Sequence, residues 1–156
     1  MSRTLVVGVG SPQGDDQAGW LVADRLTAHH TDVGSPPGWT VRRARIPLDL
    51  LDWLDGVDRL VLCDACETLG EPGQLHCWTW PDPAIAACRS LTSHDFGLSS
   101  VLQMAGALGR LPRQVTIWGI EMTGAEMNGS ELPHEPAPEL HAAVARAVAE
   151  ILAVLK

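Results

Sequence analysis

The sequence predicts an α/β fold: a three-layer sandwich in which helices cover both faces of a mostly parallel, twisted sheet of about five strands. Short apolar runs rich in β-branched residues alternate along the chain with longer stretches of helical periodicity. Several of these runs are continuously apolar, which is typical of parallel strands buried on both faces. The 156 residues fit a single domain that spans residues 1–156.

Three strands are expected in the first half of the chain. Thr4–Val9 (TLVVGV) is the first, and apolar residues at helical spacing follow it. Residues 40–46 predict the second strand, and a short helix is expected to begin near Pro47. Residues 58–64 (DRLVLCD) return to the buried-strand pattern. We expect the first strand to be central in the sheet and Asp64 to end the third.

The second half adds two strands and two helices. Residues 75–80 (LHCWTW) alternate in polarity and predict an edge strand, and residues 115–120 (VTIWGI) predict the last buried strand. A helix is expected over residues 97–109. Pro138–Leu155 predicts an Ala-rich amphipathic helix with no internal breaker.

Charge and cysteine usage exclude several classes of protein. A formal net charge of -8 argues against a protein that binds nucleic acid through clustered Lys and Arg. The small basic group Arg42, Arg43 and Arg45 is interpreted as a solvated strand edge. No segment has the pattern of a signal peptide or the length of a membrane span, and 4 cysteines without secretory features fit reduced thiols. We therefore expect a cytoplasmic protein whose partners include no nucleic acid and no membrane.

The stretch GVGSPQGDDQAGW after the first strand begins like a phosphate-binding loop. Gly8 and Gly10 supply G-x-G, but the third glycine of a dinucleotide fingerprint is misplaced. Asp15 and Asp16 follow at the start of a helix, where the helix dipole favours anionic side chains and two carboxylates would repel a phosphate. The loop therefore favours a cation as its ligand.

Acids and a histidine are expected to meet at one edge of the sheet. In open α/β sheets, ligands bind beyond the carboxyl ends of the strands. Asp15 and Asp16 follow the first strand, Asp64 ends the third, and His94 lies in the loop SHDFG before a helix. Such oxygen and nitrogen donors suit a divalent transition metal. Each residue alone also has a structural explanation: the acid pair as helix caps, Asp64 as a turn residue, and His94 as a surface residue or cap partner.

The motif CDAC, Cys63 to Cys66, has the C-x-x-C spacing of redox centres and half zinc sites. Cys63 lies inside an apolar strand, whereas a thioredoxin-type motif begins a helix, and Cys77 and Cys88 do not form a second such pair. A packing role is the favoured interpretation. The chain also contains no G-x-S-x-G or H-E-x-x-H motif, which excludes the serine-hydrolase and zincin templates.

Three motifs together resemble those of the hydrogenase maturation endopeptidases: GVGSPQGDDQAGW, then LVLCDA, then SHDFGLSSVL, in matching order and spacing. The resemblance covers nearly the whole chain. It implies a cytoplasmic endopeptidase that removes the carboxyl-terminal extension from a nickel-iron hydrogenase large-subunit precursor after nickel insertion. It also implies that Asp16, Asp64 and His94 are the catalytic and metal-binding residues, and that the nickel is supplied by the precursor.

The chain departs from that family's pattern in two loops. Ser11 stands where Asn is common, Gln17 follows the acid pair where Gly is usual, and the first loop is one residue shorter. Asp15 therefore remains an alternative to Asp16 as the first ligand. Residues 45–51 (RIPLDLL) replace a loop that commonly contains G-G-T, so the hydrogenase served is left open.

Two alternative functions come from other classes. A non-enzymatic metal-binding assembly module would use the same edge to recognise a metallated partner, and a nucleotide-binding Rossmann-like domain would use the glycine loop. Only the protease shortens a precursor, and only the nucleotide-binding domain gains thermal stability from nucleotide while nickel and precursor have no effect.

Overall fold

The chain folds into the predicted three layers, as seen in a computed structural model that describes residues 3–12, 14–33, 38–68, 70–87, 97–122 and 135–155. The strands are β1 (Thr4–Val9), β2 (Trp39–Ala44), β3 (Arg59–Cys66), β4 (Leu75–Thr79) and β5 (Gln114–Glu121). The helices are α1 (Ala18–Val33), α2 (Pro83–Ala87), α3 (Leu98–Ala107) and α4 (Pro138–Leu155), with short 3-10 helices η1 (Gly14–Gln17) and η2 (Pro47–Asp52).

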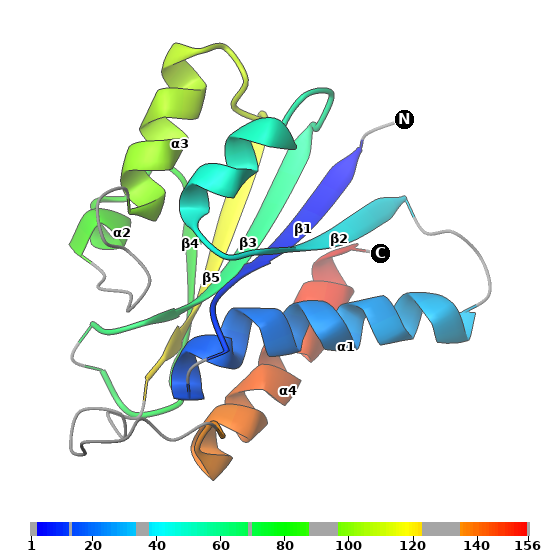
Figure 1. The fold of residues 1–156 in the computed structure, drawn as a ribbon, viewed down its shortest axis with the longest axis vertical. Helices are drawn as coiled ribbons and strands as arrows, with labels where there is room; N and C mark the ends of the chain where they lie inside the picture. The colour runs from blue at the N-terminus through cyan, green and yellow to red at the C-terminus, as the bar shows by residue number, and fades with distance from the viewer. Residues whose placement is uncertain are drawn as a thin grey trace.

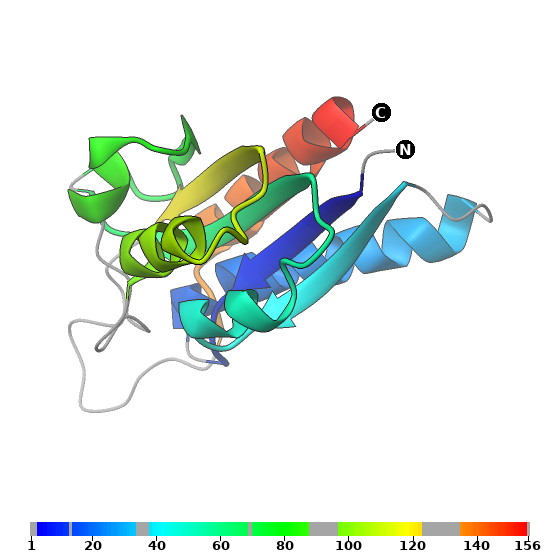
Figure 2. The same ribbon diagram turned by 90° about the horizontal axis from the view of Figure 1, so that it is seen from above.

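The five strands form one sheet in the order β2-β1-β3-β5-β4. Every neighbouring pair is parallel except β4 and β5, which run antiparallel. Helices α1 and α4 cover one face of the sheet, while η2, α2 and α3 cover the other (Figures 1 and 2). The α/β fold with a mostly parallel sheet of five strands, predicted from the sequence, is confirmed.

Strand β3 is the middle strand of the sheet, and both of its faces are covered. Successive side chains of a strand point to opposite faces. Val61 and Cys63 belong to the core under α1 and α4, whereas Leu60 and Leu62 belong to the core under η2, α2 and α3. All four are 0% exposed. This double burial explains why the strand is continuously apolar in sequence.

Two details of the strand predictions are wrong. The first strand, β1, lies between β2 and β3, so the middle position belongs to β3. The third strand also continues past Asp64 to Cys66, because β5 keeps pairing with it as far as Glu121. The predicted edge strand at residues 75–80 is confirmed as β4.

Helix α4 occupies the predicted residues, Pro138–Leu155. Its buried stripe includes Leu140, Val144 and Ile151, spaced for one helical face, and these side chains pack in the same core as Val22 and Leu26 of α1. The polar face of α4 is left to solvent. Among the described residues, no helix combines the length and the apolarity needed to cross a membrane.

The basic group on β2 is a solvated strand edge, as predicted. Arg43 lies over the ring of Trp20 at 4.1 Å and forms an ion pair of 3.6 Å with Asp24. Arg42 lies over the ring of Trp53 at 5.0 Å. These guanidinium groups therefore cover tryptophan rings beside the exposed edge of β2.

Two glycines allow α1 to lie directly against the sheet. A Cβ on Gly8 would come within 1.9 Å of the main-chain oxygen of Gly19. A Cβ on Gly19 would come within 2.2 Å of the Val9 oxygen and 2.5 Å of the Cys63 oxygen. All three obstacles are backbone atoms of β1, β3 or α1, which cannot rotate away. The first glycine of the loop thus serves close packing between helix and strand.

We expect Gly19→Ala to lower the free energy of unfolding by about 3 kcal/mol, because overpacking against backbone commonly costs 1–3 kcal/mol or somewhat more. Gly106→Ala in α3 is the matched control, since its Cβ would meet only Leu111 at 3.8 Å. Helix propensity should make that variant more stable by up to about 1 kcal/mol. Urea denaturation of both variants measures the difference, and two shifts of the same sign would contradict the close approach.

Candidate active site

The acid pair after β1 lies in η1, and its two members are placed differently. Asp15 and Asp16 are 1% and 0% exposed. The Asp15 carboxylate accepts a hydrogen bond of 3.0 Å through Oδ1 from the main-chain N–H of Ala137, the residue before α4. The Asp15 carboxylate therefore links the start of α4 to the loop after β1. This role is structural, like the helix-cap role considered for the acid pair from the sequence.

The main chain of the first loop is folded on itself. The N–H of Ser11 donates to the carbonyl of Asp16 at 3.2 Å, and the N–H of Gly10 donates to the carbonyl of Ala44 at 3.0 Å. A phosphate-binding loop instead directs such N–H groups at its ligand. Gly10 itself is required because a Cβ there would lie 2.5 Å from the Asp16 oxygen. These contacts argue against the nucleotide-binding alternative.

Asp64 lies inside β3 near its carboxyl end and is 7% exposed. Gly8 of β1 pairs with Cys63, so Asp64 is level with Val9, the last residue of β1. On its other side, Asp64 pairs with Gly119 of β5. Its position in the strand pleat places it on the same face as Leu62, which packs under η2, α2 and α3.

Two of the three predicted ligands are therefore brought to one edge of the sheet. Asp16 follows β1 and Asp64 lies near the end of its parallel neighbour β3, so both stand at the carboxyl ends of adjacent strands. His94 lies outside the described residues, and its place relative to the two acids stays a prediction. Buried carboxylate oxygens at such an edge are donors that a divalent metal accepts.

The C-x-x-C pair does not form a redox centre. Cys63 and Cys66 lie three residues apart on one strand, so their side chains point to opposite faces. Their Cα atoms are about 10 Å apart along an extended strand, and a disulfide needs less than about 7 Å. Both residues, and Cys77 on β4, keep their thiols. Burial, followed by the nearby charge of Asp64, raises the pKa of the Cys63 thiol far above its usual range.

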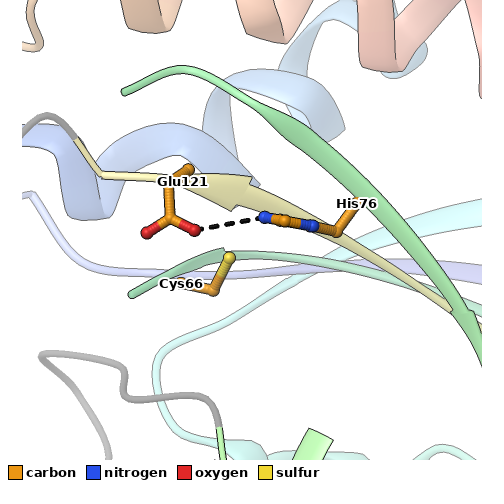
Figure 3. A group of neighbouring side chains, drawn as sticks. All are labelled: Cys66, His76 and Glu121. Atoms are coloured by element: carbon orange, nitrogen blue, oxygen red, sulfur yellow. Dashed lines mark hydrogen bonds and ion pairs between the residues drawn. The ribbon is translucent and has the colours of Figure 1, made fainter. Parts of the chain in front are cut away.

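A group of side chains that the sequence prediction did not identify lies beside Asp64. One donor atom each from Cys66, His76 and Glu121 lies within 4.8 Å of the other two, and these three residues are here named the CHE cluster (Figure 3). The His76 Nε2 donates to the Glu121 carboxylate at 3.1 Å. Thr68 donates two hydrogen bonds to the same carboxylate, from its N–H at 2.9 Å and from its hydroxyl.

The Glu121 carboxyl is buried, 2% exposed, and yet it is stabilised in its ionised form. Burial alone acts to raise its pKa, but the two hydrogen bonds from Thr68, followed by the hydrogen bond and the charge of His76, outweigh this effect and hold the pKa of Glu121 below its usual value. The cluster therefore contains a fixed negative charge. No local sequence signal predicts it, because its members come from β3, β4 and β5 and meet only through strand register.

Together, the fold and this edge define a three-layer α/β protein with buried acids at the carboxyl ends of its parallel strands. The profile of the hydrogenase maturation protease family (HycI) matches residues 46–154. That match spans well over half of the chain, and so the chain belongs to the hydrogenase maturation protease family and is a protease of hydrogenase maturation.

Relatives and solved structures agree with this assignment. The hydrogenase expression/formation protein HupD of Rhodobacter capsulatus is 28% identical over 156 residues, which cover 97% of this chain and 72% of HupD. The hydrogenase maturating endopeptidase HybD of E. coli has a TM-score of 0.75 at 22% identity, covering 98% of this chain and 91% of HybD. The hydrogenase 2 maturation peptidase of Thaumarchaeota archaeon SCGC_AB-539-E09 has a TM-score of 0.66 at 28% identity, covering 99% and 98%.

We expect iodoacetamide to modify the native protein at Cys77 well before Cys63. Cys77 is exposed on the edge strand β4, whereas Cys63 is 0% exposed and its thiolate is strongly disfavoured. Peptide mass spectrometry at successive times measures the two rates, and the urea-unfolded chain, in which both thiols are accessible, is the control. Equal rates in the native protein would contradict the burial of Cys63.

Proposed function

We propose that this protein is a cytoplasmic endopeptidase that removes the carboxyl-terminal extension of a nickel-iron hydrogenase large-subunit precursor after nickel insertion. Membership of the family supports the reaction class. The observation that carries the proposal to particular residues is the burial of two acids, Asp16 and Asp64, at the carboxyl ends of adjacent parallel strands. Buried carboxylates are stable where a cation or hydrogen-bond donors compensate their charge.

In this proposal, the nickel ion is part of the substrate. Asp16 and Asp64 offer carboxylate oxygens, and His94 is proposed as the third ligand on the basis of the family motif SHDFG. Three protein ligands leave coordination positions for the groups of the precursor that already hold the ion. Contact with the shared ion positions the extension for cleavage, so a precursor without nickel lacks the interaction that commits it to reaction.

The hydrogen bond that the Asp15 carboxylate accepts favours Asp16 over Asp15 as the ligand. The Asp15 carboxylate accepts the N–H of Ala137 and so holds the start of α4. Asp16 follows it in η1, whose main chain closes on Ser11. This division of roles matches the family motif, in which the second acid takes the ligand position.

The direct test is mass spectrometry of a large-subunit precursor from the same organism, with and without nickel, after incubation with the protein. We expect loss of one discrete carboxyl-terminal peptide from the nickel-containing precursor alone. Failure to cleave several verified nickel-containing precursors would overturn the proposal and favour the metal-binding assembly module. Cleavage of both precursor forms would retain the protease and reject the nickel dependence.

We expect Asp64→Asn to reduce the processing rate by at least about 100-fold, the loss typical when a group that stabilises only the reacting complex is removed. Asp64 lies near the carboxyl end of β3, outside the two hydrophobic cores, so the variant should keep its fold. Circular dichroism and the thermal midpoint measure this. Normal processing by the folded variant would remove Asp64 from the site.

A further comparison separates the two neighbouring acids. Asp16→Asn should abolish processing, whereas Asp15→Asn should retain most of it, because an asparagine Oδ1 can still accept the N–H of Ala137. Single-turnover processing rates of the two folded variants measure the difference. Equal or reversed losses would show that Asp15 is the ligand in this chain.

A further inference from the structure

We propose that the CHE cluster, Cys66, His76 and Glu121, is a second metal site that binds a divalent zinc-type ion independently of substrate. The proposal goes beyond the processing function and does not depend on it. The three donors are a thiol sulfur, an imidazole nitrogen and a carboxylate oxygen, with one donor atom of each within 4.8 Å of the others. A thiolate combined with an imidazole selects zinc and similar transition metals over magnesium or calcium.

The spacing of the donors is close to that of an occupied site. Nitrogen and oxygen ligands lie about 2.0–2.2 Å from zinc, so two of them at a tetrahedral angle are separated by roughly 3.4 Å. The His76 Nε2 and Glu121 Oε1 atoms are already 3.1 Å apart. No donor separation exceeds 4.8 Å, so an ion needs only a modest side-chain adjustment. The ion would thus replace the contact between His76 and Glu121 with bonds to itself.

Neighbouring groups hold two of the three ligands in place. The N–H of Thr68 donates to Glu121 Oε2 at 2.9 Å, which fixes the carboxylate and leaves Oε1 directed at His76. The His76 ring stacks on Trp78, with centroids 5.1 Å apart and an interplanar angle of 8°. Hydrogen bonds and packing that orient ligands in this way are a regular feature of metal sites.

Strand register explains how the three donors come together. His76 on β4 pairs with Gly119 on β5, and Cys66 on β3 pairs with Glu121 on β5. Paired residues of neighbouring strands lie on the same face of the sheet, so the three donors share one face. Figure 3 shows their side chains close together. Because Gly119 has no Cβ, the Cys66 sulfur can lie over β5, where an added Cβ would come within 3.0 Å of it.

The charge and exposure of the cluster suit a cation. Glu121 provides a negative charge, and the Cys66 thiol becomes a thiolate on binding, releasing its proton to solvent. The His76 Nε2 also gives up the proton that it donates to Glu121, and the ring then carries its single proton on Nδ1. The His76 side chain is 18% exposed, so an ion can reach the cluster from solvent. Three protein ligands leave a fourth position for water. The bound ion would join the antiparallel edge strand β4 to β3 and β5, next to Asp64.

The alternative is a hydrogen-bonded group that binds no metal. Thr68 and His76 already satisfy the Glu121 carboxylate, and such a network could simply anchor β4. It accounts for the contact between His76 and Glu121, whereas the metal site would also use the Cys66 sulfur, which lies within 4.8 Å of both other donors. The two explanations differ in whether the chelator-treated protein binds zinc.

The test is titration of the full chain, freed of metal and of chelator, with Zn²⁺ and with Co²⁺. We expect one zinc ion per chain, a higher thermal midpoint with zinc, and a thiolate-to-cobalt charge-transfer band in the near ultraviolet. Cys66→Ser should lose the band and bind zinc at least about 100-fold more weakly, while Thr68→Val should weaken binding by about 10-fold. Cys77→Ser is the matched control, since that exposed cysteine on β4 lies outside the cluster.

If Cys66→Ser does not fold, Glu121→Gln and His76→Gln provide the same test, with weaker zinc binding expected in each. Three outcomes would overturn the proposal: no zinc bound by the wild-type chain, a cobalt band that survives in folded Cys66→Ser, or zinc binding that Asp64→Asn abolishes and Cys66→Ser retains. The last outcome would assign the ion to the proposed nickel site that includes Asp16 and Asp64. Precursor processing is measured separately, so failure of this proposal and failure of the processing function are distinguishable.

Discussion

The close approach of α1 to the sheet is the constraint on which the candidate site depends. Gly8 and Gly19 allow the backbone of the helix to contact the backbones of β1 and β3, which brings η1 against the end of β3. The short loop between β1 and η1 then has little freedom, and the Ser11 N–H closes it on the Asp16 carbonyl. Asp16 is buried as a result of this packing. The position of one proposed ligand thus follows from two residues that have no side chain.

Sequence patterns predicted those parts of the fold that depend on local chemistry. Continuous apolar runs identified β1, β3 and β5 because both faces of these strands are buried, and the apolar stripe identified α4 with its bounds. The end of β3 was missed because it is decided by pairing with β5 as far as Glu121, a residue distant in sequence. Similarly, no local pattern shows that β4 runs antiparallel to its neighbour.

The same distinction separates the two groups of donors. Asp16 and Asp64 could be proposed from the sequence because residues that follow parallel strands gather at one edge, whatever the exact register. The CHE cluster depends on register itself: a shift of β4 by one residue would turn His76 to the opposite face. The C-x-x-C spacing suggested that Cys63 and Cys66 act together. The strand instead directs Cys63 into the core under α1 and α4, whereas Cys66 lies with His76 of β4 and Glu121 of β5.

The donor chemistry of the two sites gives them different tasks. The proposed nickel edge offers carboxylates and an imidazole but no thiolate, so it holds a free transition metal less firmly than a site with a soft ligand would. A site with such low affinity for free metal is occupied mainly when the precursor supplies an ion together with its own ligands. Cleavage then depends on the presence of that ion. The CHE cluster contains its own thiol and an ionised carboxylate, and it therefore suits an ion that remains with the protease. A resident ion there would hold β4 beside Asp64 without competing for the nickel on which the reaction depends.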